Sequence, residues 1–228
     1  MGPDGLIPDH TQYIELSGDA AVTAKALVIL AARRCPVFVI YKQRTVLHNA
    51  VGSRLKKIQV RANPAQVGKR MTRIRNKHAR LLGLPEIKWD KQSPLIQEAR
   101  DMKAVYRTAA AQAGITWAGK AATCSMRGTH SWWTVLYREI ETCALRMGLD
   151  LDIGYIHQDK RALVYDIADT LKPLFLAESL KAQPYEFRRF FELWKFYRLK
   201  RRLPLLILYF LRGTHPKCSL PRLRPYHE

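Results

Sequence analysis

Acidic side chains are scarce in this sequence of 228 residues. There are 19 Asp and Glu residues against 39 Lys and Arg residues, which gives a formal net charge of +20 at pH 7. A charge this far from zero predicts a polyanionic partner. Nucleic acid is the first candidate for that partner, and an acidic membrane surface is the second.

Cysteine and long apolar runs are scarce too. The four cysteines form no Cys-x-x-Cys pair, which argues against a disulfide framework and against a zinc knot. The longest apolar runs, 26–32 and 205–211, are far shorter than the roughly 20 residues of a membrane-spanning helix. Residues 1–9 are polar and contain Gly and Pro, unlike the apolar segment of a signal peptide. We therefore expect a soluble, cytoplasmic protein in a reducing setting. The cysteines are Cys35, Cys124, Cys143 and Cys218.

Strand-forming patterns are rare, and helical patterns fill most of the chain. In the first half only residues 36–42, which are β-branched and aromatic, give a strong strand signal, and they follow a helical segment at 19–34. A mainly α fold is therefore predicted, with four stronger helices downstream. These helices are 64–82 between Asn63 as N-cap and Gly83, 94–113 between Ser93 as N-cap and Gly114, 130–147 before Gly148, and 184–202.

The helix expected at 64–82 combines an apolar stripe with many basic residues. His78 falls in the stripe, so we expect a histidine at the edge of the core rather than a ligand. Arg70, Arg73 and Lys77 lie outside the stripe. They belong either to a solvated helix face or to a surface that contacts phosphate groups.

Two carboxylates and an imidazole stand close together in this basic chain. Asp166 and Asp169 are three residues apart, so on one helix they would share a face, and His157 precedes them by nine residues. One interpretation is structural: Asp166 caps a helix that starts at Ile167, with Asp169 in its first turn. The other is a site for a hard divalent cation, Mg²⁺ or Mn²⁺.

Two longer segments carry a resemblance to a known family. Residues 147–173, "MGLDLDIGYIHQDKRALVYDIADTLKP", closely resemble a signature of the CRISPR-associated protein one family, an integrase family. Residues 96–119, "IQEARDMKAVYRTAAAQAGITWAG", are similar to its second signature, in which a metal-binding Glu precedes a basic stretch and a Tyr. The "YDIAD" and "TW" sequences look most like the type I-E branch.

The resemblance implies an architecture and a set of site residues. Residues 1–50 would be a truncated α/β remnant of a β-rich N-terminal domain, 51–212 a helical catalytic domain, and 213–228 a basic tail. The stretch 124–148 lacks the Asn residues of the family's corresponding helix. Glu98, His157 and Asp169 would be the metal ligands, with Asp166 as a second acidic residue at the catalytic site. The residues expected to contact DNA are Lys172, Arg70, Arg73, Lys77, Arg100 and Lys103.

The resemblance also implies an activity and partners. The family joins 3′-hydroxyl ends of short protospacer duplexes to the repeat of a CRISPR array by a metal-dependent transesterification, in the prokaryotic cytoplasm. Its partners are double-stranded DNA, CRISPR-associated protein two and further copies of itself. Two alternatives stay open: a catalytically impaired homologue that acts only in DNA binding or complex formation, and a membrane-surface protein that uses the basic helix 184–202.

Overall fold

The computed structural model describes most of the chain. Described are residues 11, 13–17, 22–33, 35–41, 43–48, 54–88, 94–115 and 123–213; for 40–41, 43–48, 94–100 and 123–127 the description covers the backbone alone.

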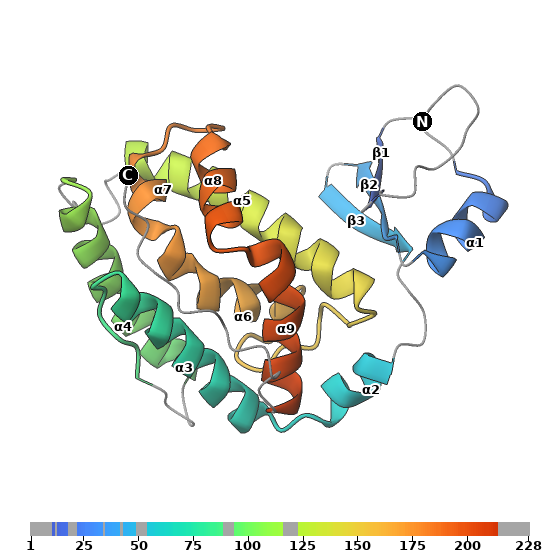
Figure 1. Cartoon of the computed structure of the whole chain (residues 1–228), viewed down its shortest axis with the longest axis horizontal. Coiled ribbons are helices and arrows are strands. Elements are labelled where there is room, and N and C mark those ends of the chain that lie inside the picture. Colours follow the sequence, from blue (N-terminus) through green and yellow to red (C-terminus); the bar gives the residue numbers. More distant parts are fainter. Residues whose placement is uncertain are drawn as a thin grey trace.

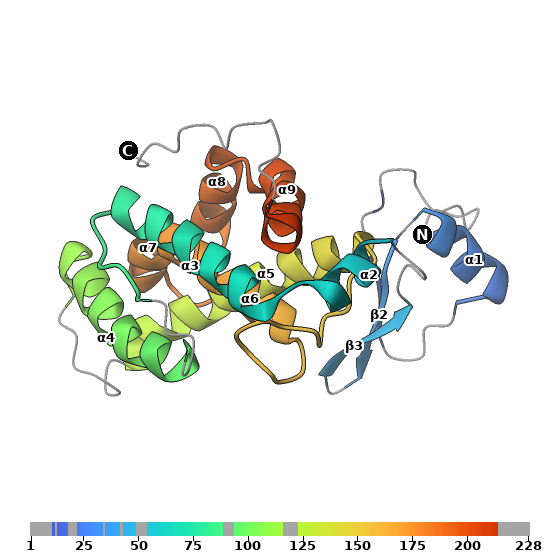
Figure 2. The ribbon, with the colours of Figure 1, turned by 90° about the horizontal axis from the view of Figure 1, so that it is seen from below.

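A small sheet with one helix lies at one end of the molecule (Figures 1 and 2). Strand β1 (Ile14–Ser17) runs parallel to β2 (Val37–Tyr41), and α1 (Ala24–Ala32) makes the crossover between them that parallel strands require. Strand β3 (Gln43–His48) pairs with the other edge of β2 in an antiparallel register. The sequence predicted α1 and β2 and missed β1 and β3, which are short and carry polar residues among the apolar ones.

Helices form most of the rest of the described chain, which confirms the predicted mainly α fold. Three of the expected glycines end their helices with positive φ: Gly83 at 64°, Gly114 at 70° and Gly148 at 71°. Asn63 caps α3 as predicted, because its Oδ1 accepts the Gln66 N–H at 3.2 Å. The helices are α2 (Arg54–Arg61), α3 (Pro64–Leu81), α4 (Pro94–Gln112), α5 (Thr123–Arg146), α6 (Ala162–Leu171), the 3₁₀ turn η2 (Lys172–Leu174), α7 (Leu176–Lys181), α8 (Arg188–Phe196) and α9 (Leu199–Arg212).

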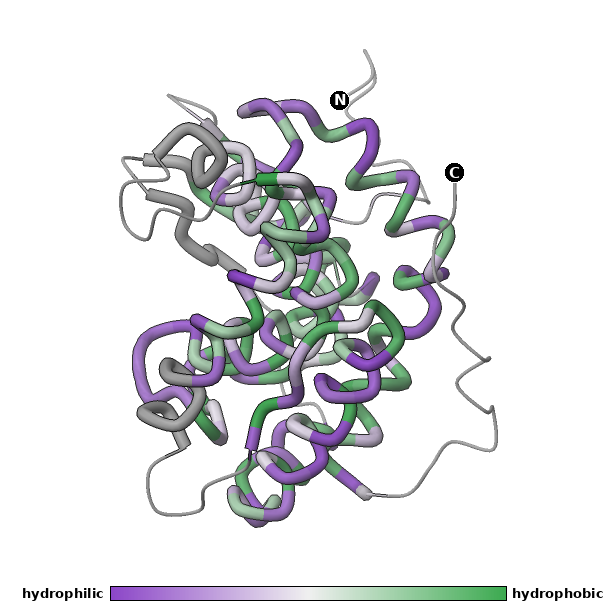
Figure 3. Tube along the Cα trace, turned by 90° about the vertical axis from the view of Figure 1, so that its left-hand side faces the viewer, coloured by the Kyte–Doolittle hydropathy of each residue, from purple (hydrophilic) through white to green (hydrophobic). Residues whose placement is uncertain are grey.

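Helix α6 is the centre of the helical body. It packs against α3 on one side and α5 on the other (Figure 1), and all of its residues except Tyr165 are buried. Around it, Trp132, Phe175 and Phe190 bring α5, the end of η2 and α8 together, with Phe175 and Phe190 stacked 4.8 Å apart. Figure 3 shows the hydrophobic residues gathered where the helices meet. Polar groups placed on α6 therefore sit in a rigid, buried frame.

The prediction that Asp166 caps a helix beginning at Ile167 is wrong. Helix α6 begins at Ala162, after Arg161 with φ 62°, and Asp166 lies in its middle. The apolar residues before Asp166, Ala162 to Val164, form the first turn of the helix, and their burial in the core stabilises that turn. A carboxylate in the middle of a buried helix needs polar partners from elsewhere in the chain.

The continuous helix predicted for 184–202 is also wrong. Pro184 lies before α8, and the backbone breaks at Arg198, whose φ is 52°, before α9 begins. This break allows α8 and α9 to bury separate apolar faces, since Phe190 and Trp194 face the core from α8 while Leu203 and Ile207 do so from α9.

The apolar run 205–211 lies within α9 and is mostly buried. Of the helices that the structure describes, none combines the length and apolarity that a membrane crossing demands.

Candidate active site

The site is built on the irregular segment between α5 and α6. The N–H groups of Tyr155, Ile156 and His157 donate to the Asp166 carboxylate at 2.5, 3.1 and 2.9 Å. Asp166 is fully buried, and these charge-assisted hydrogen bonds replace the water that it lost. The middle of α6 thereby fixes the backbone that carries His157.

The same carboxylate orients the His157 ring. Nδ1 of His157 lies 2.7 Å from Oδ1 of Asp166, and Nε2 lies 3.7 Å from Oδ2 of Asp169. In the neutral ring Nδ1–H donates to Asp166, so the lone pair is on Nε2, the nitrogen that lies next to Asp169. Tyr165 flanks the ring, with the ring centres 5.8 Å apart.

Lys172 contacts the other oxygen of Asp169. Its Nζ donates to Oδ1 of Asp169 and lies 5.5 Å from the ring centre of Tyr137 and 5.9 Å from that of Trp133. Burial alone would lower the pKa of Lys172, but the Asp169 carboxylate outweighs burial and raises that pKa above its usual value. Lys172 therefore stays charged. The two oxygens of Asp169 have different neighbours: Oδ1 accepts from Lys172, and Oδ2 faces His157.

Helix α4 reaches this group through Tyr106. Burial raises the pKa of the Tyr106 hydroxyl, and this rise is opposed by the charge of Lys172 and by a hydrogen bond to Trp133. Three helices, α4, α5 and α6, thus meet around the Lys172 ammonium.

His157 and Lys172 open onto a depression of about 620 Å³. It brings an imidazole, the exposed Lys160, the largely buried Lys172 ammonium and two phenol rings to one concave surface that a large substrate can reach. The lining residues are Tyr137, His157, Asp159, Lys160, Tyr165 and Lys172.

The structure brings together four of the predicted site residues, His157, Asp166, Asp169 and Lys172. The side chains of Glu98 and Arg100 lie outside the described residues, although both positions belong to α4. Glu98 is eight residues, about two turns, before Tyr106 on that helix.

A metal ion in a protein needs several donor side chains close together. Among the side chains that the structure describes, no group of three or more His, Cys, Asp or Glu residues could hold one. Nε2 of His157 and Oδ2 of Asp169 form a pair 3.7 Å apart, and ligand atoms about 2.1 Å from one ion can be that far from each other. Mg²⁺ or Mn²⁺ at this pair, with Glu98 as a third ligand, stays a prediction.

The basic residues predicted to contact DNA lie in different surroundings. Arg73 and Lys77 on α3 and Lys103 on α4 are exposed. Arg70 is half-buried instead: its guanidinium donates to the Phe210 carbonyl at 2.7 Å and to Oε1 of Gln66 at 3.2 Å, and so caps the end of α9.

His78 is the buried histidine that the sequence predicted. Its Nδ1 lies 2.6 Å from the Thr170 carbonyl oxygen, and burial lowers its pKa to about 4. It therefore holds α3 to α6 as a neutral ring.

Sequence reasoning assigned no site role to the aromatic wall formed by Trp133, Tyr137 and Tyr165. Trp133 is apolar and is buried on α5, as a residue of the helical core would be. The spacing held a usable signal: Tyr137 follows Trp133 by four residues and therefore lies on nearly the same helix face, next to Lys172.

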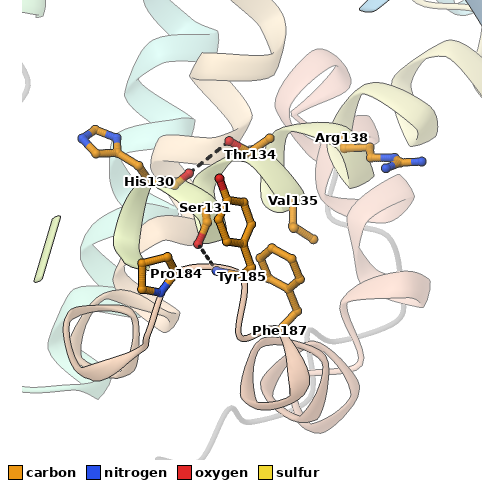
Figure 4. Close-up of a pocket in the computed structure, with 8 residues that line it drawn as sticks. All are labelled: His130, Ser131, Thr134, Val135, Arg138, Pro184, Tyr185 and Phe187. Atoms are coloured by element: carbon orange, nitrogen blue, oxygen red, sulfur yellow. Dashed lines mark hydrogen bonds between the residues drawn. The ribbon is translucent and has the colours of Figure 1, made fainter. Parts of the chain in front are cut away.

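A second hollow lies on α5 away from these residues (Figure 4). It is a cavity of about 700 Å³ between α5 and the segment before α8, and it contains none of the predicted site residues. Ser131 Oγ accepts the Tyr185 N–H at 3.2 Å there, and Arg138 at its far end pairs with Glu15 at 2.6 Å. Among the described residues that line this hollow there is no carboxylate, so its larger volume does not make it the better catalytic candidate. Its walls are His130, Ser131, Thr134, Val135, Arg138, Pro184, Tyr185 and Phe187.

The chain is similar to solved structures, but its sequence matches no family model and no curated protein. Among solved structures, it superposes on a TtCas1–DNA complex with a TM-score of 0.64 and 20% identity, over 91% of this chain and 82% of that one. The chain has the fold of Cas1.

Two further Cas1 structures give the same answer. TtCas1 alone matches with a TM-score of 0.60 and 20% identity, over 91% of this chain and 88% of that one. A CAS1 protein from Thermotoga maritima matches with a TM-score of 0.59 and 14% identity, over 93% and 90% of the two chains. The resemblance to CRISPR-associated protein one, drawn from two sequence segments, is thus confirmed at the level of the fold. Most of each solved Cas1 chain has a counterpart here, although the sequence analysis recognised only one helix and one strand before residue 50.

Proposed function

We propose that this chain is a metal-dependent DNA integrase or endonuclease of CRISPR adaptation, which joins 3′-hydroxyl ends of short protospacer duplexes to the repeat of a CRISPR array. The observation that carries the proposal is the group of His157, Asp166, Asp169 and Lys172 in a chain with the Cas1 fold. His157 and Lys172 line one open depression, and the two carboxylates are buried beside them.

Double-stranded DNA is the substrate and partner that the charge supports best. The net charge is +20, Arg73, Lys77 and Lys103 are exposed, and TtCas1 was solved as a complex with DNA. Each exposed cation that meets a phosphate releases counterions, so binding should weaken steeply as salt rises.

The reaction exchanges one phosphodiester for another. The 3′-oxygen of the protospacer bonds to the phosphorus atom at the 5′ end of the repeat strand, the bond from that phosphorus to the 3′-oxygen of the flanking nucleotide breaks, and one proton passes from the attacking hydroxyl to the leaving oxygen. Bound Mg²⁺ or Mn²⁺, held by Glu98, His157 and Asp169, would supply Lewis-acid stabilisation of the phosphate charge.

Each residue of the site has a part in that exchange. Asp166 sets the orientation of His157 through Nδ1, so that Nε2 faces Asp169. If Nε2 is not a metal ligand, it lies where it could take the proton of the attacking hydroxyl. Lys172 holds Asp169 in its carboxylate form and places a cation in the depression, where a DNA phosphate would lie.

The same proposal includes protein partners. The resemblance to the family implies a homo-oligomer and a complex with CRISPR-associated protein two. Strand transfer is therefore to be measured both with and without CRISPR-associated protein two.

A DNA-binding protein without strand-transfer activity is the second candidate. It is favoured by the Lys172–Asp169 contact, because an ammonium group already occupies one oxygen of a carboxylate that a metal would need.

A strand-transfer assay separates the two candidates. A short labelled duplex and a supercoiled plasmid bearing a CRISPR repeat are incubated with the protein in Mg²⁺ or Mn²⁺, and then in EDTA. Variants Glu98→Ala and Asp169→Ala are tested beside Glu86→Gln, a control that changes only an exposed ion pair with Arg80. Label joined to plasmid with metal, by the unmutated protein and the control alone, supports the integrase. Duplex binding without joining in any mixture supports the second candidate.

A further inference from the structure

A buried glutamine on α2 connects that helix to the segment that carries His157. Gln59 is 1% exposed, while its neighbours on the helix are basic or apolar. A buried amide must find hydrogen-bond partners, because leaving it unpaired costs more than an apolar side chain of the same size.

The partners of Gln59 all belong to one segment about 90 residues away. Nε2 donates to the Asp150 carbonyl at 2.7 Å and to the Ile153 carbonyl at 3.0 Å, and Oε1 accepts the Asp150 N–H at 2.9 Å. The Tyr155 hydroxyl then donates to the backbone carbonyl of Gln59 at 3.0 Å. One residue of α2 therefore holds the segment 150–155 at three positions.

Tyr155 links this contact to the catalytic candidates. Its hydroxyl reaches Gln59, and its N–H begins the series of three N–H groups that Asp166 accepts, ending with His157. Between α5 and α6 the backbone forms neither helix nor strand, so these side-chain contacts replace a regular hydrogen-bond ladder.

We propose that Gln59 is a positioning residue for His157. By fixing residues 150–155 it holds the His157 backbone against Asp166 and the ring next to Asp169. The proposal rests on the proposed function for its catalytic consequence, but the positioning itself can be measured without activity.

The test compares Gln59→Met with Gln112→Met. Gln112 is the control for the hydrogen bonds, because its Nε2 also donates to two backbone carbonyls, Leu82 and Gly83, at 3.0 and 3.4 Å, but at an exposed position in a different turn. Backbone amide exchange is followed by NMR in the full chain, and strand transfer is measured on the same samples. Should Gln59→Met fail to fold, Tyr155→Phe removes one hydroxyl contact and leaves the ring in place.

In Gln59→Met we expect amide exchange at Tyr155, Ile156 and His157 to rise about tenfold or more, with α3 and α5 unchanged. The kcat for joining should fall about tenfold to a hundredfold, with the Kd for duplex DNA within about twofold. Tyr155→Phe should change the same three amides by a smaller factor, and Gln112→Met should change none of them.

Unchanged exchange at 155–157 in folded Gln59→Met would overturn the proposal, as would an equal rise throughout the chain, which would make Gln59 a general stability residue. If the unmutated protein joins no DNA, the proposed function fails, and the amide exchange alone decides the role of Gln59.

Discussion

At the scale of the residue, Asp166 is the buried charged group with several hydrogen bonds that hold the site together. It is a buried carboxylate that accepts three backbone N–H groups and faces Nδ1 of His157. In Asp166→Asn an amide NH₂ would face several donors, so the free energy of unfolding should fall by about 2–4 kcal/mol and joining by at least about tenfold. Urea unfolding and the strand-transfer assay measure the two effects. Unchanged stability in this variant would mean that the N–H groups do not depend on the Asp166 charge.

His78 predicts a specific pH dependence of stability. Its pKa is about 4 in the folded protein because of burial, and about 6.5 when the chain is unfolded. The unfolded state binds the proton more readily, so this contribution to stability is complete above about pH 7 and is lost as pH falls from 6.5 towards 4. Between pH 7 and pH 5 the loss should be about 2 kcal/mol.

The measurement is urea unfolding at both pH values for the unmutated protein and for His78→Gln, whose side chain does not titrate. The variant should lose about 2 kcal/mol less than the unmutated protein over this interval. Equal losses would show that His78 is protonated in the folded protein or that another group causes the pH dependence.

At the scale of the element, the break between α8 and α9 can be tested with glycine. Arg198 has a left-handed backbone, which costs a non-glycine residue about 1 kcal/mol, so Arg198→Gly should leave stability unchanged or raise it by up to about 1 kcal/mol. Lys195→Gly, at another exposed basic position but inside α8, should lower stability by about 1 kcal/mol. Thermal unfolding distinguishes the two, and equal losses would mean that residue 198 is helical.

At the same scale, the sequence predicted best those helices whose ends are marked by capping residues, proline or glycine. Asn63, Pro64 and Gly83 mark both ends of α3, and each acts through its own backbone or its nearest neighbours. The start of α6 was missed because Asp166 bonds to a segment about ten residues before it, which a local capping rule cannot show. For the same reason, the spacing of Asp166 and Asp169 alone could not decide between a helix cap and a metal site.

In the site too, residues of one short segment could be predicted from the sequence, and residues that come from other helices could not. His157, Asp169 and Lys172 followed from a resemblance carried by residues 147–173, and the structure places them together. Tyr137, Trp133 and Gln59 come from other helices and reach the site only through packing of the whole fold. The spacing of Trp133 and Tyr137 places the two on one helix face, but it does not show that this face meets Lys172.

At the scale of the whole molecule, the positive charge should govern DNA binding. Arg73→Gln and Lys77→Gln should each weaken duplex binding and reduce the slope of log K against log salt by about 1 if they contact phosphates. Lys181→Gln is the control, since Lys181 pairs with Glu178 at 3.6 Å on α7. Fluorescence anisotropy over a series of salt concentrations measures the slopes. A slope unchanged in both α3 variants would place the DNA on another face.

The central claim is that His157 and Asp169 hold the metal ion that strand transfer needs. The most direct measurement is Mn²⁺ binding followed by electron paramagnetic resonance, with a short duplex present, in the unmutated protein, in His157→Gln and in Asp169→Asn. The account predicts a bound Mn²⁺ whose affinity falls at least about tenfold in both variants while duplex affinity is kept. Equal Mn²⁺ affinity in all three proteins would contradict it and leave the depression as a DNA-binding surface alone.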